Sequence, residues 1–317
     1  MTNAATPTTP SAANPKNPFN ETDAAMTAIT PTIDTPPTDV IETTAIAPTD
    51  QSAATGAARS KPKVRFDRVV RGEWIKFWSV RSTWATLLGA AAVTVIFGMI
   101  FSAVAGSDSE TAGPAAFLTD PVDVALGGIG LTEMLIGVLG VMVVAGEYST
   151  GLIRTSFAAV GRRARTIQAK VAVVASTVFV TGAAAVTAAI VAGQAVYGGD
   201  LPTVPVSEVL DVILGTTVYL TGVALIGVAL GFILRSTAAG IGTLVGGVFI
   251  GPNLLQLLPD SITDVFLKYL PSEAGSAMMT RVADPDLLST GAAYAVFAAW
   301  VVGLLTVAGI LVRRRDA

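Results

Sequence analysis

Six long apolar stretches run through the chain and are separated by shorter polar segments. They lie at residues 83–105, 125–145, 171–192, 211–234, 237–257 and 291–312. A helix needs about 20 predominantly apolar residues to cross about 30 Å of hydrocarbon, so each stretch is long enough to span a membrane. The pattern predicts an all-α integral membrane protein with six transmembrane helices.

The composition is that of a chain that mostly avoids water. Of its 317 residues, 52% are hydrophobic and 14% charged, and the mean hydropathy is +0.64, whereas a soluble domain has about 25% charged residues. The chain contains no Cys and no His, which excludes disulfides, thiolate nucleophiles and imidazole acid–base chemistry. We therefore expect no catalytic site, no metal site and no resident cofactor. We also expect no nucleic-acid partner.

Two segments precede the first span. Residues 1–60 are rich in Thr, Ala and Pro without apolar periodicity, which predicts a disordered cytoplasmic tail before a transmembrane domain at 61–317. Residues 61–81 form a basic amphipathic pattern that predicts an N-terminal helix in the headgroup layer, or one that packs on other protein. Its apolar side holds Phe66, Val69, Val70, Trp74 and Phe77, opposite Arg65, Arg68 and Lys76.

The distribution of cations orients the predicted spans. With the N-terminus inside, and leaving out the tail, 16 Lys and Arg residues fall in or beside cytoplasmic segments, and only Lys268 and Arg281 fall in outer loops. Acidic residues instead crowd the first outer loop, between residues 106 and 124. By the positive-inside rule, this asymmetry predicts a multi-pass protein of the plasma membrane with both termini cytoplasmic.

Residues 146–170, GEYSTGLIRTSFAAVGRRARTIQAK, form the predicted cytoplasmic connection between the second and third spans. Ser149 or Thr150 is suited to capping a short helix, and Gly151 lets a backbone come close. The apolar side of that helix would hold Leu152, Ile153 and Phe157. A cationic collar follows, made of Arg162, Arg163, Arg165 and Lys170. The positive-inside rule explains the collar, but an apolar helix side in a wet loop indicates a docking element for a cytoplasmic partner.

The segment VLGVMVVAGEYSTGLIRTSFAAVGRRARTIQAK resembles the second span and first cytoplasmic loop of type-2 ABC-transporter permeases, in particular the actinobacterial-type permeases with an E-Y-x-x-G-x-I-R core. The matching residues are Glu147, Tyr148, Gly151, Ile153 and Arg154, followed by Arg162, Arg163 and Lys170. GEWIKFWSVRSTW is similar to the family's N-terminal interfacial helix, and YLPSEAGSAMM to its element before the last span. The resemblance covers about residues 64–315, although Gly161 stands where the family commonly has Pro.

The resemblance implies the permease subunit of an ABC exporter, with a coupling helix that sits in a groove of a cytoplasmic ATPase. It implies that motion of the ATPase reaches the spans through Glu147, Tyr148, Gly151, Ile153, Arg154, Arg162 and Arg163. The chain has no G-x-x-x-x-G-K-[ST] phosphate loop, so ATP must be bound by the partner chain. The substrate stays open, as does the second permease of the dimer, which is either another copy or a paralogue.

Glu133 is the acidic residue that lies deepest in a predicted span, about eight residues or about 12 Å into the second. Acids inside a membrane are costly and are candidates for function. One interpretation places Glu133 on the substrate path or at a dimer seam. The other makes it a neutral or hydrogen-bonded side chain beside polar neighbours such as Thr132, or a residue of a span that starts later than residue 125. The alternative function is accordingly an ion-coupled secondary transporter that uses Glu133. A membrane-embedded enzyme would need paired acids, His or a metal set, which the spans lack.

Small residues at four-residue spacing predict close helix packing. The pairs are Gly227 with Gly231, Gly242 with Gly246, and Gly247 with Gly251. We interpret them as packing positions inside the bundle rather than as a dimer seam. The acidic outer segment at residues 259–290 lacks a calcium-loop pattern, and the family resemblance implies that its short helices cover the outer end of the pathway.

Overall fold

The computed structural model describes residues 65–107, 120–160, 163–197, 204–259, 263, 266–281 and 287–314. The chain divides into two units, residues 1–61 and 62–317, and all described residues belong to the second. The predicted tail and Arg162 lie outside the described residues, as do most acids of the predicted outer loops.

Helices make up the regular structure of the described ranges, and no strand occurs in them. Five membrane-length helices are α2 (Arg81–Ala105), α4 (Ile129–Ser149), α6 (Arg163–Val196), α7 (Val206–Leu234) and α12 (Thr290–Arg314). A sixth rod joins α8 (Thr237–Leu244), the π-helical η3 (Val245–Ile250) and α9 (Gly251–Leu255). The shorter helices are α1 (Phe66–Ser79), α3 (Pro121–Val124), α5 (Leu152–Val160), η4 (Leu267–Tyr269) and α11 (Pro271–Met279). The prediction of an all-α protein with six membrane-length helices is confirmed.

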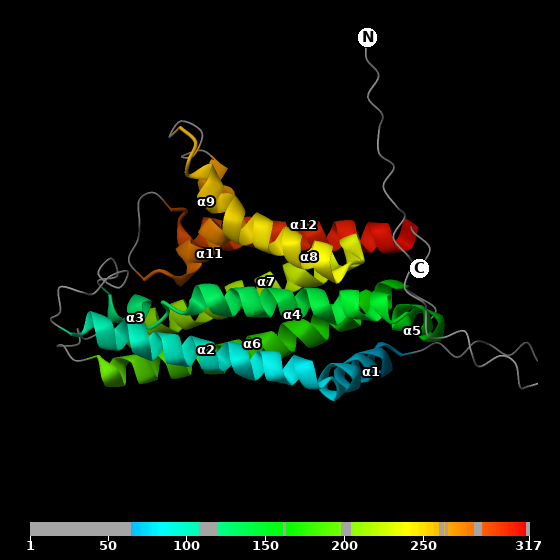
Figure 1. The fold of residues 1–317 in the computed structure, drawn as a ribbon, viewed down its shortest axis with the longest axis horizontal. Helices are drawn as coiled ribbons and strands as arrows, with labels where there is room; N and C mark the ends of the chain where they lie inside the picture. Colours follow the sequence, from blue (N-terminus) through cyan, green and yellow to red (C-terminus); the bar gives the residue numbers. More distant parts are fainter. Residues whose placement is uncertain are drawn as a thin grey trace, which may run out of the picture. The chain divides into compact units, whose positions relative to one another are not determined.

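The long helices alternate in direction, so each polar connection falls at one of two ends of the helical unit (Figure 1). At the α5 end lie α1, the start of α6, the α7–α8 break at Arg235 and the end of α12. At the α3 end lie α3 and α11. The described cations of the four predicted cytoplasmic segments therefore share the α5 end, whereas Lys268 and Arg281 belong to the segments around α11 at the α3 end.

Helix α7 is the central helix, since 72% of its apolar window is buried, against 17% for α12. It packs on α4, α6 and α12. Gly140 of α4 lies against the carbonyl of Ala224, and Gly227 of α7 lies against the carbonyl of Gly137, so an added Cβ would overlap an oxygen at either position. The glycine pair in α7 thus serves packing inside the bundle, as predicted.

The other glycine pairs have a different environment. A Cβ added at Gly242, Gly246 or Gly247 would meet no atom within 4 Å, so our interpretation of these pairs as internal packing positions was wrong for the described unit. The same segment winds as a π-helix just before Pro252. Proline has no N–H to donate and its ring crowds the preceding turn, so a locally wider helix relieves both problems.

Helix α4 begins at Ile129 instead of residue 125. Asp120 caps the short helix α3 by accepting a hydrogen bond from the Val122 N–H, and Pro121 occupies its first turn. A turn then follows, in which the carbonyl of Ala125 lies against Gly98 of α2. Residues 121–128 therefore form α3 and the turn after it instead of the first turns of α4, and α3 is buried against α2 and α6.

Candidate functional site

The predicted coupling loop begins where α4 ends. The hydroxyls of Ser149 and Thr150 both donate to the carbonyl of Gly146, so they close α4 and do not provide the expected cap of α5. Gly151 follows with φ +73°, a left-handed conformation that glycine adopts without strain, and it turns the chain into α5. The expected close approach of another backbone was wrong, since a Cβ added at Gly151 would meet no atom within 4 Å.

Helix α5 has one buried side and one exposed side. Ile153 and Phe157 are buried and anchor the helix against α4 and α6. Leu152 is 53% exposed, so the expectation that it shares the buried apolar side was wrong. The reason is angular, because Leu152 lies about 100° around the helix from Ile153. Arg154 is also exposed, but it lies on the other side of Ile153 from Leu152, about 200° away around the helix.

Tyr148 packs on the end of α7 and takes no part in the exposed surface of α5. Its ring meets Phe232 edge-on, with centroids 6.5 Å apart, and the guanidinium of Arg235 lies 5.2 Å from the Tyr148 centroid. Arg235 has φ 52° at the α7–α8 break, where Ser236 caps α8. Tyr148 therefore joins the end of α4 to the hinge between two membrane-length helices.

Four charged side chains form a ring near the end of α4, and we call it the charge ring. It consists of Glu73 and Lys76 from α1, Glu147 from α4 and Lys170 from α6. The Lys76 Nζ donates to Glu73 Oε1 at 2.8 Å and to Glu147 Oε1 at 2.9 Å. The Lys170 Nζ contacts Glu73 Oε2 at 2.8 Å and donates to Glu147 Oε1 at 2.9 Å. Two carboxylates and two ammonium groups thus join three helices.

Burial distinguishes the charge ring from surface ion pairs. The side chains of Lys170, Glu73 and Glu147 are 4%, 7% and 13% exposed, whereas Lys76 is 39% exposed. The prediction that Lys170 belongs to a cationic collar before the third span was wrong, because α6 begins at Arg163 and Lys170 lies buried two turns inside it. Lys76 likewise bends into the charge ring instead of lying on the polar side of α1.

The charge ring also explains how α1 is held. The buried side of α1 carries Val69, Glu73 and Phe77 and packs on α6, while Phe66 and Trp74 are each 44% exposed. The amphipathic helix was predicted, but its buried side is rotated from the expected apolar side, because the buried ion pairs of Glu73 draw that residue inward. The exposed Trp side chains suit a headgroup layer.

Helix α5 is tied to the charge ring through Ser156, which accepts a hydrogen bond of 3.0 Å from the Lys76 Nζ. Arg163 adds two further contacts at this end. Its guanidinium lies 5.9 Å from the Phe157 centroid, and its Nη1 donates to the carbonyl of Val312 at the end of α12. A displacement of α5 would therefore be felt by α1, α4, α6 and α12.

The charge ring perturbs the acid–base behaviour of its members. Burial alone would raise the pKa of Glu73, but Lys170 and Lys76 outweigh it and hold the pKa below its usual value of 4.5. Burial also opposes the charge of Lys76, and Glu73 and Glu147 outweigh it and hold the pKa of Lys76 above its usual 10.5. Both shifts favour the charged forms and hence the ion pairs.

Stability should therefore depend on pH at both extremes. The Glu73 contribution is complete above pH 4.5 and is lost as the pH falls through the lowered pKa of the folded state. The Lys76 contribution is complete below pH 10.5 and is lost as the pH rises through the raised pKa. We expect the unfolding temperature in detergent to fall outside this window, and the acid step to shrink in Glu73→Gln. Identical pH profiles for the two proteins would contradict the assignment.

Glu133, the candidate for the substrate path, lies four residues into α4, or about 6 Å along it, and not eight. Its buried carboxyl lies beside Tyr219 of α7, whose ring packs on Phe297 of α12 with centroids 5.2 Å apart. The expected polar neighbour Thr132 instead pairs with Thr94 of α2 at 2.8 Å. In this structure Glu133 joins α4 to α7.

A second polar cluster closes the α3 end. Arg281 pairs with Asp120 at the start of α3 and donates to Glu208 of α7 at 2.8 Å, while its backbone N–H donates to Asp123. The cluster joins α7 and the segment after α11 to α3. Among the described residues, no group of three or more acids is placed to hold a metal ion.

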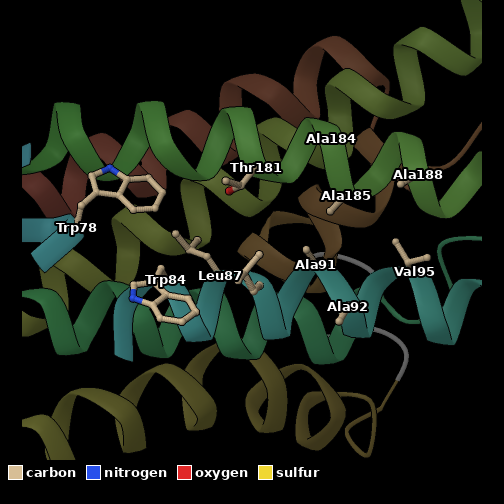
Figure 2. Close-up of a pocket in the computed structure, with 11 residues that line it drawn as sticks. Trp78, Trp84, Leu87, Ala91, Ala92, Val95, Thr181, Ala184, Ala185 and Ala188 are labelled. Carbon is tan, nitrogen blue, oxygen red and sulfur yellow. The ribbon is translucent and has the colours of Figure 1, made fainter. Parts of the chain in front are cut away.

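An apolar groove of about 690 Å³ lies between α2 and α6. Figure 2 shows Trp78 and Trp84 towards one end and alanines on the facing sides of both helices, with Thr181 as the polar side chain among the labelled residues. Ala91, Ala92, Ala184, Ala185 and Ala188 leave the space because they have short side chains. A lining of this kind suits hydrocarbon and has little with which to orient a polar ligand.

Comparison of the chain with protein-family models gave no match, and comparison with curated proteins gave none either. Sequence reasoning missed the roles of Glu73, Ser156 and Arg235. The role of Glu73 could have been found from the sequence, because a Glu in the middle of an apolar helix side needs a cationic partner.

Proposed function

We propose that the chain is the membrane-spanning permease subunit of an ABC exporter and that a separate cytoplasmic ATPase drives it. The main support for this proposal is the arrangement of helix α5. Two buried side chains, Ile153 and Phe157, fix this short helix to the bundle, and it exposes Leu152 and Arg154. Its Ser156 reaches the charge ring. A helix with this arrangement can receive a push from a docked protein and pass it to several membrane helices.

The charge distribution supports the orientation. The α5 end collects the described cations of the segments that the positive-inside rule assigns to the cytoplasm. With that end inside, α5 faces the compartment that contains ATP, both termini are cytoplasmic and the protein is multi-pass in the plasma membrane. The sequence has no phosphate loop of its own, which fits a subunit whose ATP is bound and hydrolysed by a separate chain.

The coupling residues then have separate roles. Arg154 contacts the ATPase, Ile153 anchors α5, and Gly151 supplies the turn. Glu147 and Tyr148 pass the displacement to the charge ring and to the α7–α8 hinge, and Arg163 passes it to α12.

A dimer of permeases, made of two copies or of one copy and a paralogue, would work with two ATPases. The alternative of an ion-coupled transporter has less support, because Glu133 lines neither the apolar groove between α2 and α6 nor the pocket beside the charge ring.

Co-purification tests the proposal. The tagged chain is expressed with the products of its neighbouring genes and purified in mild detergent, and any bound ATPase and its ATP hydrolysis are measured. We expect the ATPase to co-purify with the wild-type chain. Arg154→Glu should weaken its binding about tenfold or more, because interface arginines often contribute at least the 1.4 kcal/mol that corresponds to tenfold.

The matched control is Arg314→Glu, since Arg314 is an exposed arginine at the same end of the unit but lies in α12. This variant should retain the ATPase. Failure of any ATPase to bind the wild-type chain would overturn the proposal. Equal retention by Arg154→Glu and Arg314→Glu would remove α5 as the docking element.

A further inference from the structure

A second pocket of about 380 Å³ lies against the charge ring and differs in character from the apolar groove of Figure 2. It is formed where the α1–α2 elbow meets α4, α5 and α6. Its polar lining includes Glu73, Lys76, Ser82, Glu147 and Lys170, and its apolar lining includes Leu139, Met142, Val143 and Leu152. It therefore combines a charged part with a hydrocarbon-like part, which is the division found in an amphiphile.

The charge ring leaves one acceptor unused. Glu73 pairs through both of its oxygens, whereas both lysines bind Glu147 through Oε1. The Glu147 Oε2 is buried and receives no hydrogen bond from any residue that the structure describes. A buried carboxylate oxygen without a donor is costly. The missing partner must carry an N–H or O–H group.

The start of α2, in contrast, favours a negatively charged group. No side chain caps this 25-residue helix, whose N-cap is Val80 in extended conformation. Val80, Ser82 and Thr83 line the same pocket as Glu147. The free N–H groups and positive dipole of a helix N-terminus favour a phosphate. One pocket thus presents a site for a cation that donates hydrogen bonds and a site for an anion.

We propose that this pocket binds the headgroup of phosphatidylethanolamine, with its ammonium at Glu147 Oε2 and its phosphate at the start of α2. The charge ring is neutral as a set, so a zwitterion fits without adding net charge. Met142 and Leu152, 43% and 53% exposed, flank the opening towards the lipid chains. Trp78 and Trp84, both more than a third exposed at the α1–α2 elbow, suit headgroup depth. The inference does not require the ATPase partner.

Native mass spectrometry of the purified full chain tests the proposal. The protein is titrated with phosphatidylethanolamine and with phosphatidylcholine of the same acyl chains. The quaternary ammonium of phosphatidylcholine has no N–H to donate, so we expect phosphatidylethanolamine to bind about tenfold tighter, because a charge-assisted hydrogen bond contributes at least the energy of a tenfold preference. Glu147→Gln, which places an amide in the charge ring, should abolish the preference.

A second variant protects the test against misfolding of Glu147→Gln. Met142→Trp fills the opening without touching a charge and should weaken phosphatidylethanolamine binding about tenfold. Met134→Trp is the control, since Met134 is also in α4, is 38% exposed and lies outside the pocket lining. Equal binding of the two lipids to the wild-type chain would overturn the proposal and assign Glu147 Oε2 to water. Equal losses in Met142→Trp and Met134→Trp would also overturn it.

Discussion

Replacement of Lys170 by methionine is expected to lower the free energy of unfolding by about 3–5 kcal/mol, the usual effect of removing one partner from a buried ion pair. Lys170 neutralises Glu73 Oε2 and shares Glu147 Oε1 with Lys76. Without it, two carboxylates remain buried beside Lys76 alone. Methionine keeps the unbranched apolar stem of lysine and is only one atom shorter, so the lost charge dominates the effect. Denaturant titration of the purified protein in mixed micelles measures it.

The control for this experiment is Arg71→Met, since Arg71 is a cation on the exposed side of α1. Exposed charges contribute about 1 kcal/mol at most, so Arg71→Met should leave the titration midpoint nearly unchanged. A Lys170→Met protein as stable as Arg71→Met would show that the charge ring contributes nothing to folding. It would also weaken the proposal that the charge ring passes force between α1, α4 and α6.

The second large effect is expected at Gly227. An added Cβ would overlap the carbonyl of Gly137, a backbone atom that cannot move without shifting α4 against α7. We expect Gly227→Ala to lower the free energy of unfolding by about 1–3 kcal/mol, as overpacking of a close-packed core does. The same titration in mixed micelles measures the loss.

Gly242→Ala provides a matched control. Both glycines belong to pairs at four-residue spacing, but an added Cβ at Gly242 meets no atom within 4 Å. Alanine is the better helix former by about 1 kcal/mol, so Gly242→Ala should be neutral or stabilising. Equal destabilisation by the two variants would contradict the packing that we assign to α4 and α7.

The sequence predicted the long helices well, because membrane-length apolar stretches are a strong signal. All six membrane-length helices are present, and the break at Arg235 and Ser236 falls where it was expected. The ends were less accurate. Helix α4 starts late because Pro121 and Asp120 begin a separate buried helix, and α6 starts early because Lys170 has partners in α1 and α4. Hydropathy does not register a buried charge whose partners are distant in sequence.

The candidate site shows the same division. A short two-sided helix after Gly151 was predicted, but the turn at Gly151 and the exposed position of Leu152 were not. Glu147 was selected for its place in the E-Y-x-x-G-x-I-R core, and that pattern alone predicts nothing about Glu73, which lies 74 residues earlier. The prediction that these residues couple to an ATPase stays a prediction, with Arg154→Glu as its test.

The sequence by itself determined the class of this protein, its six apolar helices and the clustering of cations in alternate connections. These properties are local, because each follows from the length and composition of one segment. Only the tertiary structure decided that two acids and two lysines form one buried ring, and that two glycines out of a similar set carry the α4–α7 contact. Such choices depend on which helix faces lie opposite one another, and that geometry arises only when the helices pack.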